Sequence, residues 1–254
     1  MAITIKSERE IELMAEAGKI LERVHNELEK ALRPGMSTKD IDTLGEEIIR
    51  SYGCIPSFLN YNGYPASICV SVNQEVVHGI PDKHRIIHEG DIVSLDAGVI
   101  YKGYHSDAAR THAVGEVSEE AKKLIQVTKE CFFEGIKYAK AGNHLFDISG
   151  AIGRYAEERG YGVVRDLCGH GIGTALHEAP EIPNYEVGRK GVKLRPGMTL
   201  AIEPMINIGT YEVDWLDDDW TVVTRDGSLS AHYENTILIT EGEPRILSLT
   251  CDNE

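Results

Sequence analysis

The sequence predicts an α+β fold made from a duplicated unit, in which a pair of helices is followed by strands twice along the chain. Helical spacing of apolar residues alternates with short runs that are typical of strands. Glycines and carboxylates of the first half also reappear in the second half at one constant offset. No low-complexity stretch or Ser/Gly linker divides the 254 residues, so we expect one domain over 1–254, with halves of about 1–115 and 116–254.

The first half opens on two predicted helices. Ser7 and Glu10 form a capping-box signature, and apolar residues recur at helical spacing behind it. Arg33-Pro34-Gly35 ends this helix, and Ser37-Thr38 begins the next one. Runs typical of strands follow at residues 66–72, 91–100 and 104–114.

The second half repeats this order. Ser118 begins a predicted helix that runs to about residue 140, and another helix spans about 144–159. Asp226-Gly227 is a strong hairpin signal, and a two-residue turn there would pair Tyr233 with Trp220 and place Glu234 beside them. Further runs typical of strands lie at 162–168, 198–208, 220–224 and 229–240.

A single offset of 107 residues relates the two halves. It aligns Gly35 with Gly142, and the run Gly-Asp-Ile-Val-Ser-Leu-Asp at 90–96 with Gly-Met-Thr-Leu-Ala-Ile-Glu at 197–203. Helix ends, strand starts and carboxylates all agree at this offset, which predicts a pseudo-twofold duplication. Two packed halves leave an interface near the middle, where ligand sites commonly form.

Composition and charge exclude several classes of protein. The net charge is −15 and no Lys/Arg cluster resembles a nucleic-acid footprint, so we expect no DNA partner. No apolar run approaches the ~18 residues of a membrane span, and the first residues do not form a secretory signal. The cysteines lack C-x-x-C spacing, which favours reduced thiols and a cytoplasmic protein. They are Cys54, Cys69, Cys131, Cys168 and Cys251.

Two carboxylates are predicted to lie together on neighbouring strands. Asp96 and Asp107 belong to runs joined by residues 100–103. A turn of all four residues, or of the central two, places Asp96 opposite Asp107, whereas a turn at 102–103 pairs Asp96 with Ala109 and makes Asp107 its diagonal neighbour. Each register puts both carboxylates on one face. Like charges this close need a proton or a cation between them.

The second half supplies further ligand candidates. Glu203 ends an apolar strand and Glu234 interrupts another, while His170 lies between glycines in Gly-His-Gly-Ile-Gly, with His177 seven residues later. Each residue alone is more often structural, but four carboxylates and one imidazole, all at strand ends or in β-hairpins of a duplicated unit, indicate a metal site. Such a set suits Mn²⁺, Fe²⁺ or Co²⁺. Four carboxylates exceed the charge of one divalent ion, which favours a dinuclear site.

The order of these candidates resembles the metal-ligand set of the pita-bread metallopeptidases, which include methionine aminopeptidases, aminopeptidase P and prolidase. Within that family, nearly the whole chain is similar to the type I methionine aminopeptidases of bacteria. The resemblance implies the pita-bread fold, with a curved antiparallel sheet covered by helices. The matching segments are 60–65 (Asn-Tyr-Asn-Gly-Tyr-Pro), 73–81 (ending in His-Gly-Ile-Pro), 169–173, 195–198 (Arg-Pro-Gly-Met), 202–204 (Ile-Glu-Pro) and 220–222 (Trp-Thr-Val).

Three absences narrow the resemblance. Aminopeptidase P and prolidase carry a sizeable N-terminal domain, and this sequence begins almost at once with the predicted catalytic unit. Only 25 residues separate His177 from Glu203, which leaves no room for the helical insertion of type II enzymes. No N-terminal zinc-finger extension precedes the core, so we expect a bacterial type.

The resemblance implies a reaction and a role for each ligand. It implies removal of the initiator methionine from new proteins whose second residue is small, by hydrolysis that depends on two divalent ions (Mn, Fe or Co). Asp96 is implied to ligate one ion and His170 the other, while Asp107 and Glu234 bridge them. Glu203 is implied as a ligand of the second ion and as the general base for the attacking water.

The same resemblance implies the substrate contacts. His78 is expected to contact the scissile amide or its leaving nitrogen, and His177 to bind the substrate carbonyl oxygen. Peptides and nascent chains with N-terminal Met are the implied partners, with a transient ribosome contact, and we expect a monomer that binds no membrane. The residues that resemble the methionine pocket are Tyr61, Tyr64, Cys69 and Trp220.

Four residues depart from the pattern of the bacterial enzymes. Phe58 replaces a smaller residue, which narrows the mouth of the substrate pocket. Leu176, also expected to contact substrate, stands where an aromatic side chain is frequent. His232 and Asn235 flank Glu234 where Gln and His are commoner, which changes the surroundings of the ligands.

Two other functions compete with this interpretation. An Xaa-Pro aminopeptidase of the same fold is the nearest alternative, and a non-catalytic binding module is disfavoured because all five ligand positions are filled. We expect the acidic run 217–219 to be a solvated loop. The remaining histidines, expected to be surface or structural, are His25, His84, His88, His105, His112 and His144.

Overall fold

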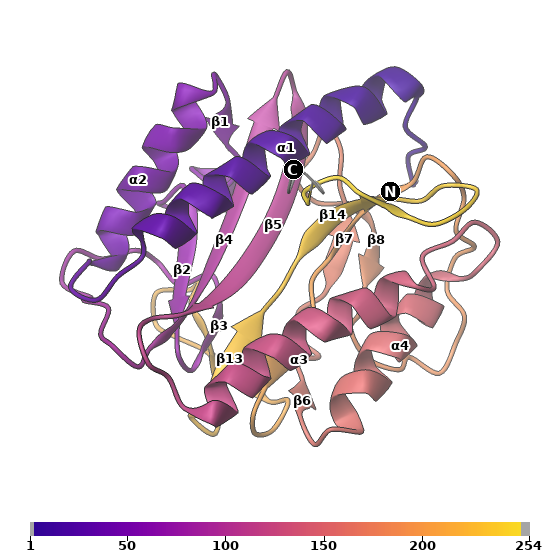
Figure 1. Cartoon of the computed structure of the whole chain (residues 1–254). Coiled ribbons are helices and arrows are strands. Elements are labelled where there is room, and N and C mark those ends of the chain that lie inside the picture. The colour runs from indigo at the N-terminus through magenta and orange to yellow at the C-terminus, as the bar shows by residue number, and fades with distance from the viewer. Residues whose placement is uncertain (1–2, 250–254) are drawn as a thin grey trace.

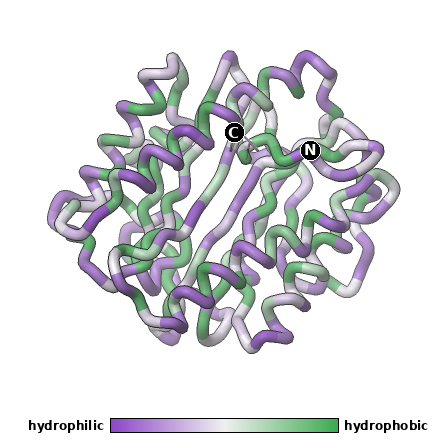
Figure 2. The backbone as a smooth tube through the Cα atoms, in the orientation of Figure 1, coloured by the Kyte–Doolittle hydropathy of each residue, from purple (hydrophilic) through white to green (hydrophobic). Residues whose placement is uncertain are grey.

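Two pairs of helices cover the strands in the computed structural model, which describes residues 3–249 (Figure 1). Helices α1 (Glu8–Ala31) and α2 (Thr38–Ser51) lie over the strands of the first half. Helices α3 (Glu119–Ile136) and α4 (Leu145–Glu157) lie over those of the second half. Along these helices hydrophobic and hydrophilic residues alternate, so that one side of each helix packs inward (Figure 2).

The starts of the helices agree with the sequence prediction. Ser7 Oγ accepts a hydrogen bond from Glu10 N, and the Glu10 carboxylate accepts one from Ser7 N at 2.8 Å. Ser37 and Asp40 form the same reciprocal box at the start of α2. These bonds satisfy backbone N–H groups that have no partner within the helix.

Helix α3 ends at Ile136, earlier than the predicted residue 140. Tyr138 N and Ala139 N donate to carbonyl groups three residues earlier, so the last turn tightens before Gly142. Gly142 adopts a φ of 94°, which a helix cannot contain. The prediction of a longer helix was therefore wrong.

The first half contains a four-stranded sheet whose central strand is β4 (Ile92–Tyr101), which pairs with each of the other three strands. Strand β5 follows a two-residue turn at Lys102-Gly103, because Tyr101 pairs with Tyr104. Both turn residues have positive φ, at 48° and 87°. Of the three registers considered, the tight turn at 102–103 is the one adopted. The partners of β4 are β1 (Ile55–Pro56), β2 (Ile68–Val72) and β5 (Tyr104–Ala113).

The second half contains a five-stranded sheet in the order β15-β14-β9-β7-β8. Its strand β14 runs beside β5 of the first half: Glu234 N, just before β14, donates to Ala109 O at 3.0 Å. The two halves therefore meet along β5 and β14 in the middle of the molecule (Figure 1). The strands are β7 (Gly169–Gly171), β8 (Glu178–Ile182), β9 (Thr199–Ile202), β14 (Asn235–Leu238) and β15 (Arg245–Ile246).

Two small three-stranded sheets, β13-β10-β6 and β11-β12-β3, complete the fold. A 3-10 turn, η1 (Tyr61–Gly63), precedes β2. The long runs predicted at 162–168, 198–208 and 229–240 are each shorter or interrupted; Glu203-Pro204 separates two of the resulting strands. The strands of the small sheets are β3 (Glu75–Val77), β6 (Gly162–Val163), β10 (Met205–Asn207), β11 (Val213–Trp215), β12 (Val222–Thr224) and β13 (Ser230–His232).

The prediction that the strands on either side of Asp226-Gly227 pair as a hairpin was wrong. The chain does reverse there, but β12 pairs with β11 and β3, while β13 pairs with β10 and β6. Residues 73–74 of the first half lie between the two arms: Thr224 N donates to Gln74 O and Ser230 N donates to Asn73 O, both at 2.9 Å. Tyr233 therefore does not pair with Trp220.

The duplication predicted from the sequence is present in the backbone. Ser37 bridges Ile86 in the first half, and His144 bridges Lys193 in the second, each residue being shifted by 107. Gly35 and Gly142 have φ values of 90° and 94°. The α+β fold with a duplicated helix-helix-strands unit is thus confirmed, while the exact boundary between the halves stays a prediction.

Within residues 3–249, none of the helices has the length and the apolar character that crossing a bilayer requires. Four cysteines are free in the structure, namely Cys54, Cys69, Cys131 and Cys168. Cys251, which we also expected to be reduced, lies outside the described residues.

Candidate active site

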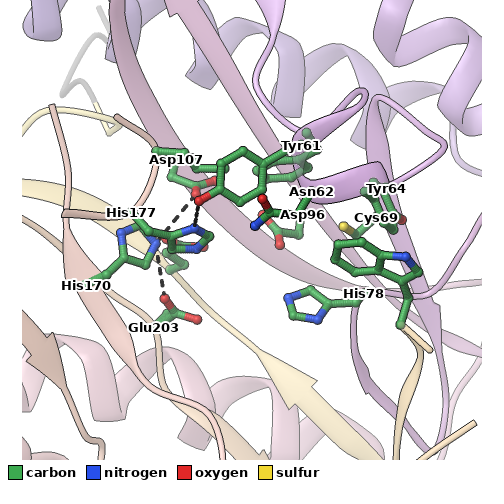
Figure 3. Close-up of a pocket in the computed structure, with 14 residues that line it drawn as sticks. Tyr61, Asn62, Tyr64, Cys69, His78, Asp96, Asp107, His170, His177 and Glu203 are labelled. Atoms are coloured by element: carbon green, nitrogen blue, oxygen red, sulfur yellow. Dashed lines mark hydrogen bonds and ion pairs between the residues drawn. The ribbon is translucent and has the colours of Figure 1, made fainter. Parts of the chain in front are cut away.

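One cavity of about 190 Å³ collects every residue predicted to bind metal or substrate (Figure 3). Asn62 lines it as well, although we assigned no role to this residue. The signal was present, because Asn62 belongs to a matching segment and adopts a φ of 48° in η1. The other lining residues are Phe58, Tyr61, Tyr64, Cys69, His78, Asp96, Asp107, His170, Leu176, His177, Glu203, Trp220 and Glu234.

The five candidate metal ligands converge from five separate strands. Asp96 lies on β4 and Asp107 on β5, whereas His170 lies on β7. Glu203 directly follows β9, and Glu234 directly precedes β14. Both sheets and both halves therefore contribute to one polar cluster.

The ligand atoms of this cluster are within reach of one another. Asp107, His170 and Glu234 each offer an atom within 4.8 Å of the others. His170 Nε2 lies 3.9 Å from Asp107 Oδ2 and 3.6 Å from Glu203 Oε1. Asp96 is close enough to Asp107 for a side-chain hydrogen bond.

The electrostatics of the cluster are unfavourable for a protein without a bound cation. Burial raises the pKa of Asp96 to about 7. Burial, with repulsion from the neighbouring carboxylates, raises the pKa values of Asp107, Glu203 and Glu234 well above their ordinary range. A protein that holds so many acidic groups in one dry place needs protons or cations there.

The donor set fits divalent metal ions. One carboxylate oxygen on each of Asp96, Asp107 and Glu234 is buried without a hydrogen-bond partner. His170 Nδ1 donates to Gly171 O at 2.9 Å, which leaves the lone pair of Nε2 facing the carboxylates. Burial also lowers the pKa of His170 to about 3, so the ring is neutral at pH 7, as a metal ligand must be.

His232 lies closer to this cluster than the sequence suggested. Its Nε2 is 3.9 Å from Glu203 Oε2 and 3.9 Å from Glu234 Oε2, and both ring nitrogens are buried without a partner. Asn235, the other unusual neighbour of Glu234, instead accepts hydrogen bonds from Arg110 Nη2 at 2.6 Å and Ser248 Oγ at 3.0 Å.

Tyr61 and His177 form a hydrogen-bonded pair at the rim of the cavity. The Tyr61 hydroxyl lies 2.7 Å from His177 Nδ1 (Figure 3). Burial lowers the pKa of His177, which favours the neutral ring near pH 7. A neutral ring with its proton on Nε2 accepts a hydrogen bond from the Tyr61 hydroxyl at Nδ1, whereas a ring with its proton on Nδ1 donates one to the hydroxyl oxygen. The His177 ring also packs edge-on against His170, with centroids 4.2 Å apart.

Aromatic side chains form the apolar part of the cavity. The Trp220 ring packs edge-on against Tyr64 and His78, with centroids 5.1 and 6.2 Å away. Tyr64 is fixed from behind, since its hydroxyl donates to Gly79 O at 2.9 Å. Cys69 pairs directly opposite Asp96 across β2 and β4, so pocket wall and metal cluster lie on the same face of the sheet.

Three further positions shape the pocket. Phe58 packs over the backbone of Gly98, where a Cβ atom would lie 3.0 Å from its ring. His78 adopts a φ of 60°, and burial lowers its pKa to about 4. Leu176 is buried in the same hydrophobic cluster as Phe58. The positive φ of His78 is a strained backbone conformation. Such strain persists only where the surrounding structure holds it, and it is frequent at functional sites.

The residues expected to lie outside the site do so. His84 and His88 are exposed, whereas His25 is buried and donates from Nε2 to Ala108 O at 2.8 Å. The acidic run 217–219 is an exposed loop, as predicted. Within it, Asp218 accepts hydrogen bonds from the two backbone N–H groups that follow the run, which orients the start of β12.

Comparison with known proteins defines the class. The model of metallopeptidase family M24 matches residues 12–241. The chain belongs to this family and has its pita-bread fold.

Within the family, the chain is similar to bacterial methionine aminopeptidases. It is 59% identical over 247 residues to the methionine aminopeptidase of Clostridium acetobutylicum, which covers 97% of this chain and 99% of that protein. The crystal structure of methionine aminopeptidase from Thermotoga maritima matches with a TM-score of 0.96 at 47% identity, and covers 98% of this chain and 100% of that one. An Xaa-Pro dipeptidase from Bacillus anthracis matches with a TM-score of 0.77 at 28% identity, and covers 97% of this chain but 62% of that one. The Xaa-Pro alternative is therefore not favoured.

Proposed function

We propose that this protein hydrolyses the first peptide bond of chains that begin with methionine and have a small second residue. The observation that carries the proposal is one cavity with two kinds of wall. A buried cluster of carboxylates and an imidazole forms one wall, and aromatic rings form the other. The similarity to methionine aminopeptidases over the whole chain supports the same function.

The polar wall would hold two divalent cations. The residues that would hold them are Asp96, Asp107, His170, Glu203 and Glu234, through carboxylate oxygens and an imidazole nitrogen. Four carboxylates match the charge of two divalent ions, and their mixture with imidazole suits Mn²⁺, Fe²⁺ or Co²⁺. When bound, the cations polarise the scissile carbonyl group and make a water molecule more acidic near neutral pH.

Glu203 acts as the general base. Its carboxylate takes a proton from the attacking water as the water oxygen bonds to the carbonyl carbon. The same carboxyl group returns a proton to the leaving nitrogen when the carbon–nitrogen bond breaks. Without cations, burial and the nearby Asp96 raise the pKa of Glu203 well above its ordinary range; bound cations would oppose this shift and favour the ionised carboxylate that a general base requires.

His177 and His78 contact the reacting amide. We assign to His177 the tautomer in which Nδ1 accepts from the Tyr61 hydroxyl, so that the Nε2–H group donates to the carbonyl oxygen as negative charge develops there. His78 is neutral near pH 7 because burial lowers its pKa to about 4, and its ring lies beside Trp220. We expect His78 to hydrogen-bond the scissile amide or its leaving nitrogen.

The aromatic wall selects the first side chain. Tyr61, Tyr64, Cys69 and Trp220 enclose an apolar space that suits an unbranched thioether. Phe58 and Leu176 narrow this space further. The sulfur of methionine makes favourable contacts with aromatic rings, which aliphatic side chains cannot make.

The natural substrates would be peptides and nascent chains in the cytoplasm. We infer a monomer that contacts the ribosome transiently. Sedimentation of the purified protein, alone and with ribosomes, measures both properties directly.

A peptide assay tests the function. The metal-free protein is reconstituted with Mn²⁺, Fe²⁺ or Co²⁺ and incubated with Met-Ala-Ser and with Ala-Pro-Ala. Release of methionine from the first peptide alone is the expected result. Cleavage of the second alone would assign an Xaa-Pro aminopeptidase, and no cleavage of either would assign a binding module.

A further inference from the structure

The segment before α1, residues 3–7, packs against the second half of the protein. Lys6 N donates to Gly197 O at 2.8 Å. The backbone at Gly197 has a φ of 86°, and a Cβ atom there would lie 2.7 Å from Ile5 Cγ2. The segment is therefore held closely beside the turn that leads into β9 and Glu203.

The side chain of Lys6 is buried and forms an ion pair. Its Nζ lies 2.7 Å from Glu178 Oε2, and the two side chains are 4% and 13% exposed. Thr4 Oγ1 donates to the same carboxylate oxygen at 2.7 Å. Burial by itself raises the pKa of Glu178, but the hydrogen bonds from Lys6 and Thr4 outweigh it and hold the pKa below its ordinary value.

The same carboxylate organises the loop that precedes it. Glu178 Oε1 accepts a hydrogen bond from Ala175 N at 3.3 Å, and Gly173 N donates to Ala175 O at 3.1 Å. Gly173 packs so closely on the ion pair that a methyl group there would overlap both Lys6 and Glu178. Residues 173–178 are thus folded around the Lys6–Glu178 pair.

This loop carries His177 into the active site. Glu178 is its direct neighbour and begins β8, where it pairs with Gly171 next to His170. The backbone of His177 is therefore fixed through Glu178, while its ring is fixed by Tyr61. Removing one partner of a buried ion pair leaves a charge without compensation, so the loop would have to rearrange.

We propose that Lys6 is a positioning residue: through its ion pair with Glu178 it holds the 173–178 loop so that His177 meets the substrate carbonyl. This role rests on the proposed function, which makes His177 the group that contacts that oxygen. Lys6 itself touches neither substrate nor the metal cluster.

The first test compares lysine variants. Lys6→Met is expected to lower kcat for a methionine-initiated tripeptide about 10- to 100-fold, the scale for a displaced catalytic group, with a smaller change in KM and unchanged metal content. Lys6→Arg, which keeps the charge, is expected to retain most of the activity. Lys137→Met is the matched control, because Lys137 pairs with Glu134 at 2.6 Å but is 61% exposed.

The second test asks whether the effect passes through His177. In a His177→Ala background, Lys6→Met is expected to cause no further loss of kcat, since the group that it displaces is absent. If Lys6→Met lowers kcat by the same factor in both backgrounds, it acts by general destabilisation and the proposal is overturned.

A measurement without substrate separates this inference from the proposed function. The imidazole NMR signals of His177, assigned by their loss in His177→Ala, are expected to shift in Lys6→Met and not in Lys137→Met. Failure of the wild type to cleave Met-Ala-Ser would remove the proposed function while this shift remains. An active wild type whose His177 signals and kcat are both unchanged by Lys6→Met would remove the positioning role alone.

Discussion

Ala109 and Glu234 exchange both of their backbone hydrogen bonds, at 3.0 and 3.4 Å, across the junction of the two halves. On its other side, Ala109 pairs directly with Asp96. Side chains of directly paired residues lie on the same face of a sheet. The methyl group of Ala109 therefore lies between the side chains of Asp96 and Glu234 on this face. Asp107 lies two residues along the same strand and points to the same face.

Ala109→Val should leave too little space between the side chains of Asp96 and Glu234. Two added methyl groups would push Asp96 and Glu234 apart, and we expect metal affinity to fall about 10- to 100-fold, as for other changes next to metal ligands. Cobalt titration of the metal-free protein measures the affinity. Ala113→Val makes the same change at an exposed position of β5 and should leave affinity unchanged. Unchanged cobalt affinity in Ala109→Val would contradict the prediction, because the space between Asp96 and Glu234 would then tolerate a larger residue.

Activity should depend on bound divalent metal. One carboxylate oxygen on each of Asp96, Asp107 and Glu234 has no hydrogen-bond partner among the described residues, and the attraction of Arg110 for Glu234 does not offset the burial and repulsion that raise the pKa of Glu234. Chelation is expected to abolish turnover, and Mn²⁺, Fe²⁺ or Co²⁺ to restore it with about two ions per chain at saturation. Turnover by protein shown to be metal-free would contradict the mechanism.

Glu203→Gln should lower kcat at least about 10²-fold, the usual scale for losing a general base. Glutamine keeps the size of the side chain and one ligand oxygen, but it cannot accept the proton of the attacking water. Because Glu203 is also a proposed ligand, metal content is measured in the same samples. A variant with normal metal content and wild-type kcat would exclude Glu203 as the base.

His25 should lower the stability of the metal-free protein in mild acid, whereas the active-site carboxylates, whose pKa values are raised, act in the opposite direction. Burial, with the nearby Arg110, lowers the pKa of His25 well below its usual 6.5. The unfolded chain takes up a proton below about pH 6.5 and the folded chain does not, so this group's contribution to stability is present above that pH and is lost below it.

The variant His25→Gln tests whether His25 makes the unfolding free energy decrease as the pH falls. The amide can still donate to Ala108 O, as His25 Nε2 does, but it cannot titrate. The pH dependence of the unfolding free energy, measured in urea between about pH 7 and pH 5, should flatten by up to about 1.4 kcal/mol per pH unit. His88→Gln, at an exposed position, is the control. Equal slopes in His25→Gln and wild type would contradict the assignment.

The sequence predicted the parts of this protein that local chemistry decides. Capping boxes such as Ser7 with Glu10 and turn glycines such as Gly142 act within a few residues, so helix starts and the repeat could be predicted. That the five candidate ligands come together could be predicted, because Asp96 and Asp107 lie on one hairpin and the other three lie at strands or strand ends in recognisable motifs. In both cases the signal lies next to the residue that it positions.

The errors arose where distant segments decide the structure. Asp226-Gly227 does reverse the chain, but Asn73 and Gln74 from the first half lie between its arms and keep them from pairing. The register at Lys102-Gly103 stayed open because every alternative left Asp96 and Asp107 on one face. His232 reaches Glu203 only because β13 pairs with β10, which no local pattern indicates.

The last prediction concerns specificity and depends on Trp220. Its ring closes the aromatic wall against Tyr64 and His78, yet it is not a proposed ligand. In the wild type, methionine should be preferred over alanine about 10- to 100-fold, since the longer side chain buries two to three more groups at about 0.8 kcal/mol each. Isoleucine should also be poor, because branching next to the backbone widens the side chain where the pocket is narrow.

Trp220→Ala should therefore lower kcat/KM for methionine-initiated tripeptides and reduce the preference for methionine over alanine. It should leave the metal content unchanged. Trp215→Ala is the matched control: it removes the other tryptophan, which is 50% exposed and does not line the cavity. Measuring kcat/KM for Met-, Leu-, Ile- and Ala-initiated tripeptides on all three proteins separates pocket from metal effects. Equal rates for methionine and alanine substrates in the wild type would leave a metallopeptidase whose first subsite does not select methionine, and the aromatic wall would need another role.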